Sequence, residues 1–236
     1  KDLRNFDHIF VASDTYKDKI LSRSTVKNVT TLLQCTDPSK FNILNKQDCD
    51  GITGKTILFI GNSRKQPRPI VINAIKAKYD LHVYGSMWKN LIPGKFIKGE
   101  KVKHEELNRY YQSCGVLLND HWDLMRQEGF VSNRLFDGSA AGATIVSDKV
   151  DGIKEIFGGS IYEYDGTARD LKKTVDLALQ ERNCLKTLER RKKIAYYIAK
   201  HHSFEARFDK ILSVIENLRN AGKQRRLNIG KPINNN

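Results

Sequence analysis

Three segments of this 236-residue chain place glycine, small polar residues and cations after apolar runs, a composition that suits an anionic ligand. The first segment contains Gly61, Asn62 and Ser63, with Arg64 and Arg68 close behind. Backbone N–H groups at such a turn, and guanidinium groups beside it, donate hydrogen bonds to phosphate. We therefore predict phosphate contact here, while a solvated turn between a strand and a helix remains the structural alternative.

The second segment follows the run DLHVY and contains Gly85 and Trp88. A glycine turn at this point brings the tryptophan to the same edge of the predicted sheet as the first segment. The ring can line a ligand pocket or pack against the core, and the sequence favours neither.

The third segment runs from Cys114 to Asp148 and is the most informative. A helix is predicted to begin near Ser132 or Asn133, and its first N–H groups form an anion site. Arg134 and Asp137 are three positions apart, so they are expected to face the same cleft. A carboxylate at Asp137 suits a pair of sugar hydroxyls better than it suits a phosphate.

His121 stands at the end of the strand that opens this third segment. A histidine there can act as a general base, but hydrogen bonding within the protein is the usual role. We expect His121 to contact phosphate or to support a neighbour that does.

The sequence predicts no bound metal. Asp48 and Asp50 form a DxD sequence, but they lie in a polar stretch that is typical of a solvated loop rather than of a strand end. The cysteines show no CxxC spacing and are interpreted as reduced thiols. They are Cys35, Cys49, Cys114 and Cys184.

The chain carries a formal charge of +14 at pH 7, which favours a polyanionic ligand, substrate or surface. The basic residues are spread along the sequence without a zinc-finger or aromatic RNA-binding pattern, so we predict no nucleic-acid partner. One basic run, ERRKKIAYYIAKHH, is expected either to contact an anionic membrane or glycan or to form a solvated helix face. We expect a cytoplasmic protein whose only membrane contact is peripheral, at the inner face.

Apolar, β-branched runs alternate with helical patterns along most of the chain. This alternation predicts an α/β fold with a Rossmann-like parallel sheet and helices on both faces. Small residues from Gly138 to Gly142 should let the helix that carries Asp137 pack closely against the sheet. The predicted divisions are a linker over residues 42–55, a ligand-binding domain over 56–200, a helix over 201–221 and a disordered basic tail over 222–236.

The run EGFVSNRLFDGSAAGATIVSD, which begins at Glu128, resembles the donor-binding signature of glycosyltransferases with two facing Rossmann-like domains, the GT-B class. The strand end NDHW and the run SNRLFD are similar to the group-one and spore-maturation-type branch. The resemblance extends in the family's order from Phe6 to about Leu218. It implies the carboxy-terminal half of a GT-B fold, with residues 56–200 as its nucleotide-sugar-binding domain.

The resemblance implies a nucleoside-diphosphate sugar as donor substrate, a glycan or cell-surface polymer as acceptor, and neither a metal nor a separate cofactor. Glu128 and Asp137 are nine positions apart where the family has eight, a departure that concerns Glu128 more than Asp137. The resemblance implies that Glu128 binds the donor sugar hydroxyls and that Asp137 binds the ribose hydroxyls. It implies that the backbone of Val102 holds the base and that Arg64 or Arg68 neutralises the leaving diphosphate. The residues whose backbone is implied to contact the diphosphate are Gly129, Phe130, Val131, Ser132 and Asn133.

Residues 1–41 resemble the end of the family's amino-terminal domain and its interdomain strand, so one strand and a connector are expected there. In the family, the rest of that domain supplies the acceptor site and any catalytic base. This chain alone is therefore expected to bind donor but to transfer sugar poorly. The alternatives are a nucleotide-sugar epimerase or sugar phosphorylase of the same architecture, and a basic nucleic-acid-binding module.

Overall fold

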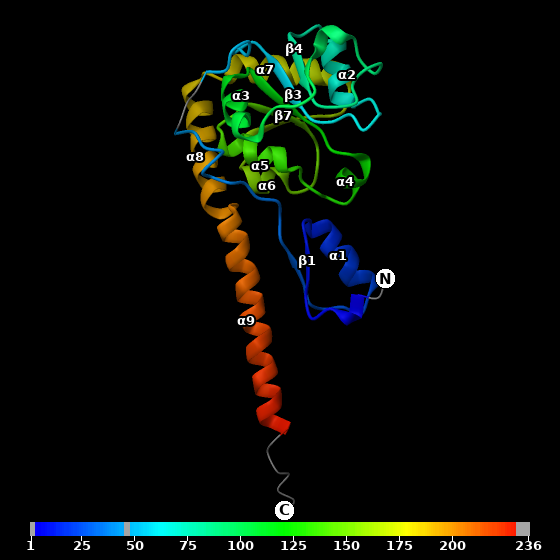
Figure 1. Cartoon of the computed structure of the whole chain (residues 1–236), viewed down its shortest axis with the longest axis vertical. Helices are drawn as coiled ribbons and strands as arrows, with labels where there is room; N and C mark the ends of the chain where they lie inside the picture. The colour runs from blue at the N-terminus through cyan, green and yellow to red at the C-terminus, as the bar shows by residue number, and fades with distance from the viewer. Residues whose placement is uncertain (1–2, 45–47, 230–236) are drawn as a thin grey trace, which may run out of the picture.

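A parallel sheet of six strands forms the centre of the computed structural model, which describes residues 3–44 and 48–229 (Figure 1). Every strand pair in this sheet is parallel, and the order is β5-β4-β3-β6-β7-β8. The predicted α/β fold with a parallel sheet is therefore confirmed. The strands are β3 (Ile57–Ile60), β4 (Leu81–Tyr84), β5 (Ile97–Gly99), β6 (Val116–Asn119), β7 (Ile145–Asp148) and β8 (Ile161–Tyr164).

Helices cover both faces of this sheet because its central strands are apolar on both sides. Successive side chains of a strand point to opposite faces, so Ile57 and Phe59 pack with α2 and α7 while Leu58 packs with α3, α5 and α8. The covering helices are α2 (Pro69–Lys76), α3 (Leu107–Ser113), α5 (Asn133–Ala140), α7 (Ala168–Glu181) and α8 (Leu185–His201). Shorter helical segments lie in the connections: η1 (Leu3–Asn5), η2 (Gly94–Phe96), η3 (His104–Glu106), α4 (Asp123–Gln127) and α6 (Ile153–Phe157).

The strand order reverses between β3 and β6. The chain passes from β3 outward to β4 and β5, then returns to the other side of β3 to form β6. In an open parallel sheet, such a reversal leaves a crevice at the carboxyl ends of the two strands, because their following connections run in opposite directions. This edge of the sheet is where the first and third predicted segments meet.

A small βαβ unit precedes the sheet. It consists of β1 (Ile9–Val11), α1 (Asp14–Arg23) and β2 (Val29–Thr31), and its two strands pair in parallel. Only one strand and a connector are predicted for this segment. The sequence gives little sign of α1, because no residue of this helix is buried and its apolar periodicity is weak. Ser13 starts the helix by accepting a hydrogen bond from the Tyr16 backbone N–H at 3.1 Å.

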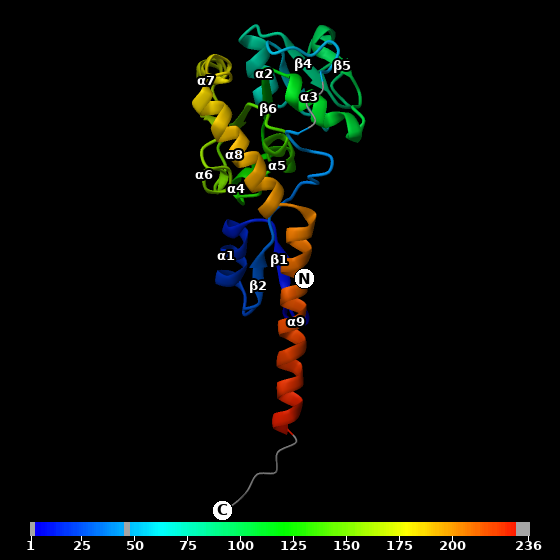
Figure 2. The ribbon, with the colours of Figure 1, turned by 90° about the vertical axis from the view of Figure 1, so that its left-hand side faces the viewer.

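The last helix, α9 (Phe204–Ile229), runs away from the sheet beside the βαβ unit (Figure 2). The predicted helix over 201–221 thus begins at Phe204, and Ser203 Oγ accepts a hydrogen bond from the Ala206 N–H at 3.2 Å just before it. The prediction of disorder from residue 222 is wrong for residues 222–229, which belong to α9. Residues 230–236 lie outside the part of the chain that the structure describes. An interior glycine costs a helix only about 1 kcal/mol, and the Lys, Gln, Arg and Leu residues that follow favour helix. None of the described helices is both long and apolar enough to cross a membrane.

The four cysteines are free thiols, as predicted. Cys114 is buried against the core, and burial raises the pKa of its thiol to about 12. Because the thiolate is the reactive form, Cys114 acts as a small apolar residue at neutral pH.

Close packing of α5 on the sheet depends on Gly138. A Cβ atom at this position would lie 2.8 Å from Leu117 Cδ2 and 3.0 Å from Ile145 Cδ1. We predict that Gly138→Ala lowers the free energy of unfolding by about 1–3 kcal/mol through overpacking, measured by urea denaturation. Gly94→Ala is the control, since nothing lies within 4 Å of its Cβ position. Equal stability of both variants would contradict this packing.

Candidate functional site

Arg134 lies in the crevice between the carboxyl ends of β3 and β6. Its Nη1 donates to Asn119 Oδ1 at 2.8 Å, and its guanidinium stands 4.9 Å from the centre of the Phe59 ring. Asn119 is itself fixed, because its amide nitrogen donates to Ser147 Oγ at 3.0 Å. A Cβ on Gly61 would meet Arg134 Nη2 at 2.6 Å. Because Gly61 has no side chain, it leaves room for the Arg134 guanidinium where the strand order reverses.

The ends of β3 and β4 are held together closely. Gly85 has a φ of +141°, and a Cβ there would lie 2.2 Å from the Gly61 carbonyl oxygen. Asn62 Oδ1 accepts from the Ser86 N–H at 2.8 Å, and the Ser63 N–H donates to the Ser86 carbonyl at 3.1 Å. The predicted residues Gly61, Asn62, Ser63 and Gly85 thus form one rigid edge.

Trp88 packs and does not line an open pocket. Its side chain is buried, its Nε1 donates to the Gly61 carbonyl at 2.8 Å, and its ring meets Phe59 edge to face at 5.7 Å. Of the two roles left open by the sequence, the structure favours packing. Trp88 thus supports this edge through the hydrogen bond from its indole N–H to the Gly61 carbonyl.

The two predicted arginines differ in their electrostatic state. Arg68 is buried and forms an ion pair with Asp120. Burial raises the pKa of Asp120, although the pairing with Arg68 opposes this shift. Arg64 is exposed and has no acidic partner among the described residues. Both guanidinium groups lie over the Trp122 ring, at 5.2 Å for Arg64 and 4.0 Å for Arg68. Among the described residues, Arg64 is thus an exposed cation without an acidic partner, whereas Arg68 is a buried cation paired with Asp120.

The turn that carries Arg64 is strained. Arg64 and Lys65 have φ values of +53° and +62°, and left-handed non-glycine residues cost roughly 1–3 kcal/mol each. Ser63 offsets this cost, because its hydroxyl and its carbonyl accept from the N–H groups of Lys65 and Gln66, each at 3.1 Å. Consecutive strained residues held by a buried serine are typical of a functional turn.

His121 is fully enclosed and bonded at both ring nitrogens. Its Nε2 accepts from the Ser132 backbone N–H at 2.9 Å, so Nδ1 carries the proton and donates to Asp148 Oδ1 at 2.7 Å. The Asp148 carboxylate also accepts from the His121 N–H at 3.1 Å. His121 is thus neither a solvent-facing base nor a phosphate contact. It fixes the loop that leads into α5.

This bond changes the expectation for the backbone at the start of α5. The Ser132 N–H is used by His121, and the Gly129 and Phe130 N–H groups donate within the same loop. To contact a diphosphate, these three N–H groups would have to give up the hydrogen bonds that they make in this structure. Asn133 and Arg134 open the helix, where N–H groups have no intrahelical acceptor. The Val131 side chain is buried in the core.

Asp137 lies one turn into α5 and is buried. Its Oδ1 accepts from Thr36 Oγ1 at 2.7 Å, and its Oδ2 accepts from Asn133 Nδ2 at 2.8 Å. Burial raises the pKa of Asp137 to about 6, although these hydrogen bonds and the Arg134 charge lower it. The predicted proximity of Asp137 and Arg134 is consistent with this arrangement.

Glu128 does not join this group. Its carboxylate forms an ion pair with Lys19 of α1, and its carbonyl accepts from Ser13 Oγ. Gly129 follows with a φ of +69°, and a Cβ there would meet Thr15 Oγ1 at 2.8 Å. The first predicted acid thus contacts the βαβ unit, which the longer spacing to Asp137 accommodates.

The remaining predicted positions contribute little geometry. Val102 is half-buried in the loop after β5. Asp48 and Asp50 are exposed. Within residues 3–44 and 48–229, no group of three His, Cys, Asp or Glu side chains is arranged to hold a metal ion.

Several residues that hold the predicted site residues by hydrogen bonds are not themselves among the predicted site residues. Asp148 and Asn119 each end a buried strand, and that placement is the signal that could have identified them. Asp120 follows directly after Asn119 and binds Arg68. Thr36 gave no local signal, since its partner Asp137 is 101 positions away.

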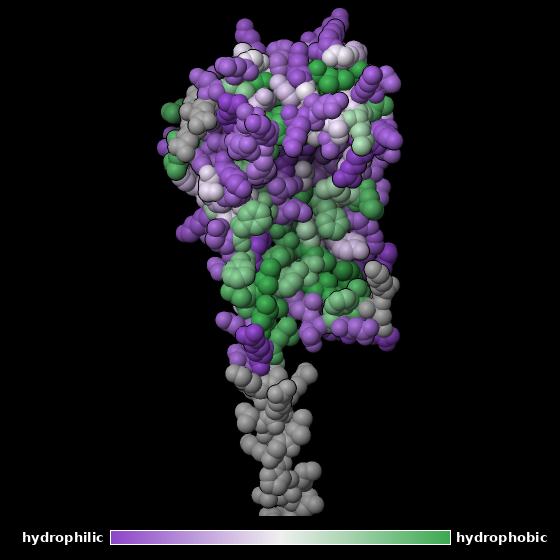
Figure 3. Space-filling view, viewed as in Figure 1, coloured by the Kyte–Doolittle hydropathy of each residue, from purple (hydrophilic) through white to green (hydrophobic). Residues whose placement is uncertain are grey.

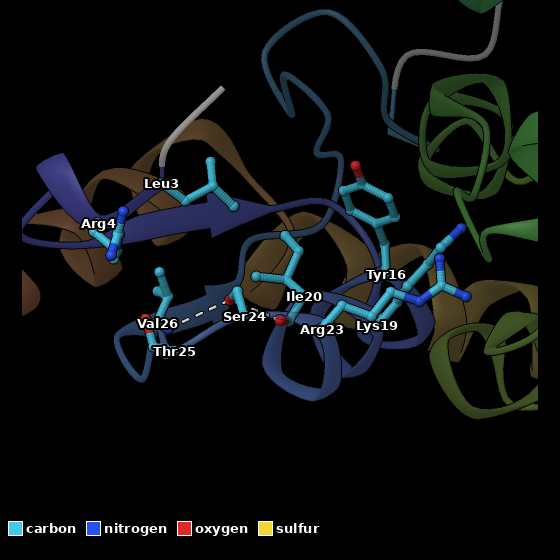
Figure 4. Close-up of a pocket in the computed structure, with 9 residues that line it drawn as sticks. All are labelled: Leu3, Arg4, Tyr16, Lys19, Ile20, Arg23, Ser24, Thr25 and Val26. Atoms are coloured by element: carbon cyan, nitrogen blue, oxygen red, sulfur yellow. Dashed lines mark hydrogen bonds between the residues drawn. The ribbon is translucent and has the colours of Figure 1, made fainter.

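One hollow adjoins these residues, and another lies away from them. One of about 280 Å³ lies between the β3–α2 loop and the ends of β6, β7 and β8, where Arg68, Asp120 and Trp122 line it. Another of about 530 Å³ lies in the βαβ unit (Figure 4), where Tyr16, Lys19 and Arg23 line it. The second contains none of the predicted site residues.

The comparisons with known proteins agree on one class. Residues 64–213 match the family described as glycosyl transferase-like. Sucrose-phosphate synthase from Thermosynechococcus elongatus has a similar structure, with 14% identity, a TM-score of 0.69, and coverage of 93% of this chain and 60% of that one. A glycosyltransferase from Rickettsia africae gives 9% identity, a TM-score of 0.64, and coverage of 89% and 63%.

An α-glucosyltransferase in complex with UDP-glucose and DNA containing an abasic site gives 14% identity, a TM-score of 0.62, and coverage of 89% and 65%. This chain therefore spans less than two thirds of the solved proteins it resembles. No curated protein matches it significantly in sequence. At these identities the structural likeness establishes the fold, which is that of part of a GT-B protein.

We predict that His121→Ala destabilises the protein, because it leaves Asp148 and the Ser132 N–H without a partner, at about 1–3 kcal/mol for each buried group. His121→Asn and His121→Gln each keep one of the two interactions and should fall between the alanine variant and the wild type. Urea denaturation measures all three. Lys89→Ala, at an exposed position, is the control. An alanine variant as stable as the control would show that the histidine carries no structural role.

Proposed function

We propose that this chain, which belongs to the glycosyl transferase-like family, binds a nucleoside-diphosphate sugar as the donor for glycosyl transfer. The observation that carries the proposal is the position of Arg134. A half-buried cation stands where the strand order of a parallel sheet reverses, at the start of a helix, with an acid one turn further on. Nucleotides bind at such crevices in α/β sheets.

The diphosphate end of the proposed site is cationic. Arg134 is fixed in the crevice, and Arg64 extends from the strained turn beside it. The first-turn N–H groups of Asn133 and Arg134 add the partial positive charge of a helix N-terminus. Arg68 contributes little charge here, since Asp120 balances it.

The ribose end of the proposed site is Asp137. A carboxylate accepts hydrogen bonds from two adjacent hydroxyls, and its two oxygens provide about four acceptor positions. Thr36 and Asn133 occupy one position on each oxygen. The remaining positions are available to the ribose hydroxyls.

We propose that transfer needs no metal. When the bond between the donor sugar and the diphosphate breaks, negative charge develops on the leaving diphosphate. Preorganised cations and helix N–H groups stabilise that charge, and Arg64, Arg134 and the start of α5 supply them. The acceptor, which the resemblance implies is a glycan or cell-surface polymer, then forms the new bond to the sugar.

We propose that a larger amino-terminal domain of the same enzyme completes the site. The described βαβ unit has only two strands, which is too few for a stable sheet. An apolar surface spreads over α9 and this unit (Figure 3), and large apolar patches mark interaction surfaces. Its large exposed side chains on α9 are Phe204, Phe208, Leu212, Ile215 and Leu218.

We also propose a peripheral contact between α8 and an anionic membrane on the cytoplasmic side. The structure divides the predicted basic cluster, because Arg191 turns inward and donates to the Gly142 carbonyl at 3.2 Å and to Thr144 Oγ1 at 2.6 Å. The outward side chains form what we name the α8 outer face. It consists of Leu185, Lys186, Glu189, Lys192, Lys193, Tyr196, Tyr197 and Lys200.

The composition of the α8 outer face supports this contact. Four lysines and one glutamate give it a positive charge, while Leu185 is 73% exposed and Tyr196 is 50% exposed. Lysine beside exposed leucine and tyrosine is typical of helices that lie at a membrane interface.

Calorimetry with UDP-glucose tests the donor site. We predict binding that is unchanged by a metal chelator, and about ten-fold weaker binding by Asp137→Asn, since a hydrogen bond to a charged group contributes about 1.5–3 kcal/mol. Asp151→Asn, at an exposed position, is the matched control. Loss of binding in chelator would overturn metal independence, and an unchanged Kd for the Asp137 variant would remove Asp137 from the site.

Vesicle flotation tests the α8 outer face. We predict binding to phosphatidylcholine vesicles only when they contain an anionic phospholipid. Replacing both Lys192 and Lys193 by glutamate should weaken binding by more than about thirty-fold, since each of the two lost cations contributes about 1 kcal/mol. Replacing Lys98 of β5 and Lys101 of the loop after it by glutamate makes the same charge change elsewhere on the protein. Equal losses in the two double variants would mean that net charge, and not this face, drives binding.

A further inference from the structure

Thr36 lies where three distant segments of the chain meet. It belongs to the connector, residues 32–36, that leads from β2 toward the sheet. Its N–H donates to the His202 carbonyl at 2.9 Å, and it forms a parallel bridge with Ser203, at the break between α8 and α9. Its hydroxyl donates to Asp137 Oδ1 at 2.7 Å, and the residue is 1% exposed.

The connector on which Thr36 lies is itself fixed by Arg207 of α9. This guanidinium donates to the Leu33 carbonyl at 2.7 Å, the Gln34 carbonyl at 2.9 Å and the His201 carbonyl at 3.1 Å. It also donates to His202 Nδ1 at 2.6 Å. The connector and the helix break are thus one hydrogen-bonded unit, and Thr36 cannot move independently of it.

The same unit presses against α5. The His202 ring packs against Phe136 at 5.4 Å, directly beside Asp137. Burial and the nearby Arg207 charge lower the pKa of His202 to about 4, so the ring is neutral near pH 7 and its Nδ1 accepts the Arg207 hydrogen bond. The unit that holds Thr36 thus also packs on α5, at the residue next to Asp137.

We propose that Thr36 is a positioning residue for the donor-binding carboxylate of Asp137. This inference rests on the proposed function, in which Asp137 accepts the ribose hydroxyls. Thr36 holds Oδ1 and Asn133 holds Oδ2, so the carboxylate keeps one orientation and presents its remaining lone pairs in fixed directions. The β-branched side chain restricts χ1 and thereby fixes the direction of the hydroxyl.

The hydrogen bond has a measurable electrostatic consequence. It lowers the pKa of Asp137, so its removal raises that pKa above its value of about 6. Since the ionised carboxylate binds the hydroxyls, donor binding weakens as pH falls through this pKa. Loss of the Thr36 hydroxyl therefore moves the pH at which binding weakens upward. The titratable and charged groups that face Asp137 are Arg134 of α5, His104 of η3, Tyr111 of α3 and Cys35 of the connector.

The test compares Thr36→Val, which keeps the shape and lacks the hydroxyl, with Thr36→Ser, which keeps the hydroxyl. UDP-glucose is the probe, because it has no phosphate proton that titrates near pH 6. We expect Thr36→Val to weaken UDP-glucose binding about ten-fold at neutral pH and to move the pH midpoint of binding upward. Thr36→Ser restores both values toward those of the wild type. Thr25→Val, at an exposed position before β2, leaves both unchanged.

A second measurement, the titration of the Asp137 carboxyl by carbon-13 NMR, needs no ligand. The proposal expects a higher pKa of Asp137 in Thr36→Val and a wild-type value in Thr36→Ser. It is overturned if the valine variant keeps the wild-type pKa, or if it binds UDP-glucose with the wild-type Kd and pH midpoint. If the wild type itself binds no UDP-glucose, the proposed donor fails, and the NMR titration alone decides whether Thr36 governs Asp137.

Discussion

The hydrogen bond between Arg134 and Asn119, made in the crevice between β3 and β6, is the interaction on which the rest of the site depends. The reversed strand order opens the crevice, and Gly61 leaves room for the guanidinium within it. Ser147 turns the Asn119 amide so that its oxygen faces the cation. The position of the charge is therefore set by three strands and one helix, and not by a surface loop. Fixed charges of this kind need no reorganisation when a ligand's charge changes.

Burial and pairing distinguish Arg68, which supports the site, from Arg64, which we propose binds the ligand. Arg68 is paired with Asp120, and its guanidinium packs on Trp122. Arg64 lies over the same ring and has no acidic partner among the described residues. A buried pair contributes little net field because its two charges cancel, yet it fixes the geometry of its neighbours. The formal charge of +14 is thus a poor guide to the site, where the local balance of paired and unpaired groups decides.

The sequence predicts what local periodicity controls. It predicts the alternation of strands and helices in the α/β fold and the proximity of Arg134 and Asp137, because both follow from the periodicity of residues close together in the chain. It fails where a distant partner decides. Glu128 is committed to Lys19, which lies 109 positions earlier, and His121 is enclosed by Asp148 and Ser132. Neither partnership leaves a periodic pattern, so a chemically capable residue type is visible while its actual contact is not.

The connector to the βαβ unit and the proposed donor site share one carboxylate, and this has a thermodynamic consequence. Thr36 contacts Asp137 on one side and the α8–α9 break on the other, where Arg207 fixes both the connector and the break. A ligand that bonds to Asp137 changes the strength of the Thr36 hydrogen bond, and any shift of the connector changes the carboxylate that the ligand meets. Coupling between two sites is reciprocal, so the free energy by which one perturbs the other is the same in both directions. Hydrogen bonds to charged groups contribute about 1.5–3 kcal/mol, and this range is the upper limit of the coupling that one such bond to this carboxylate can carry.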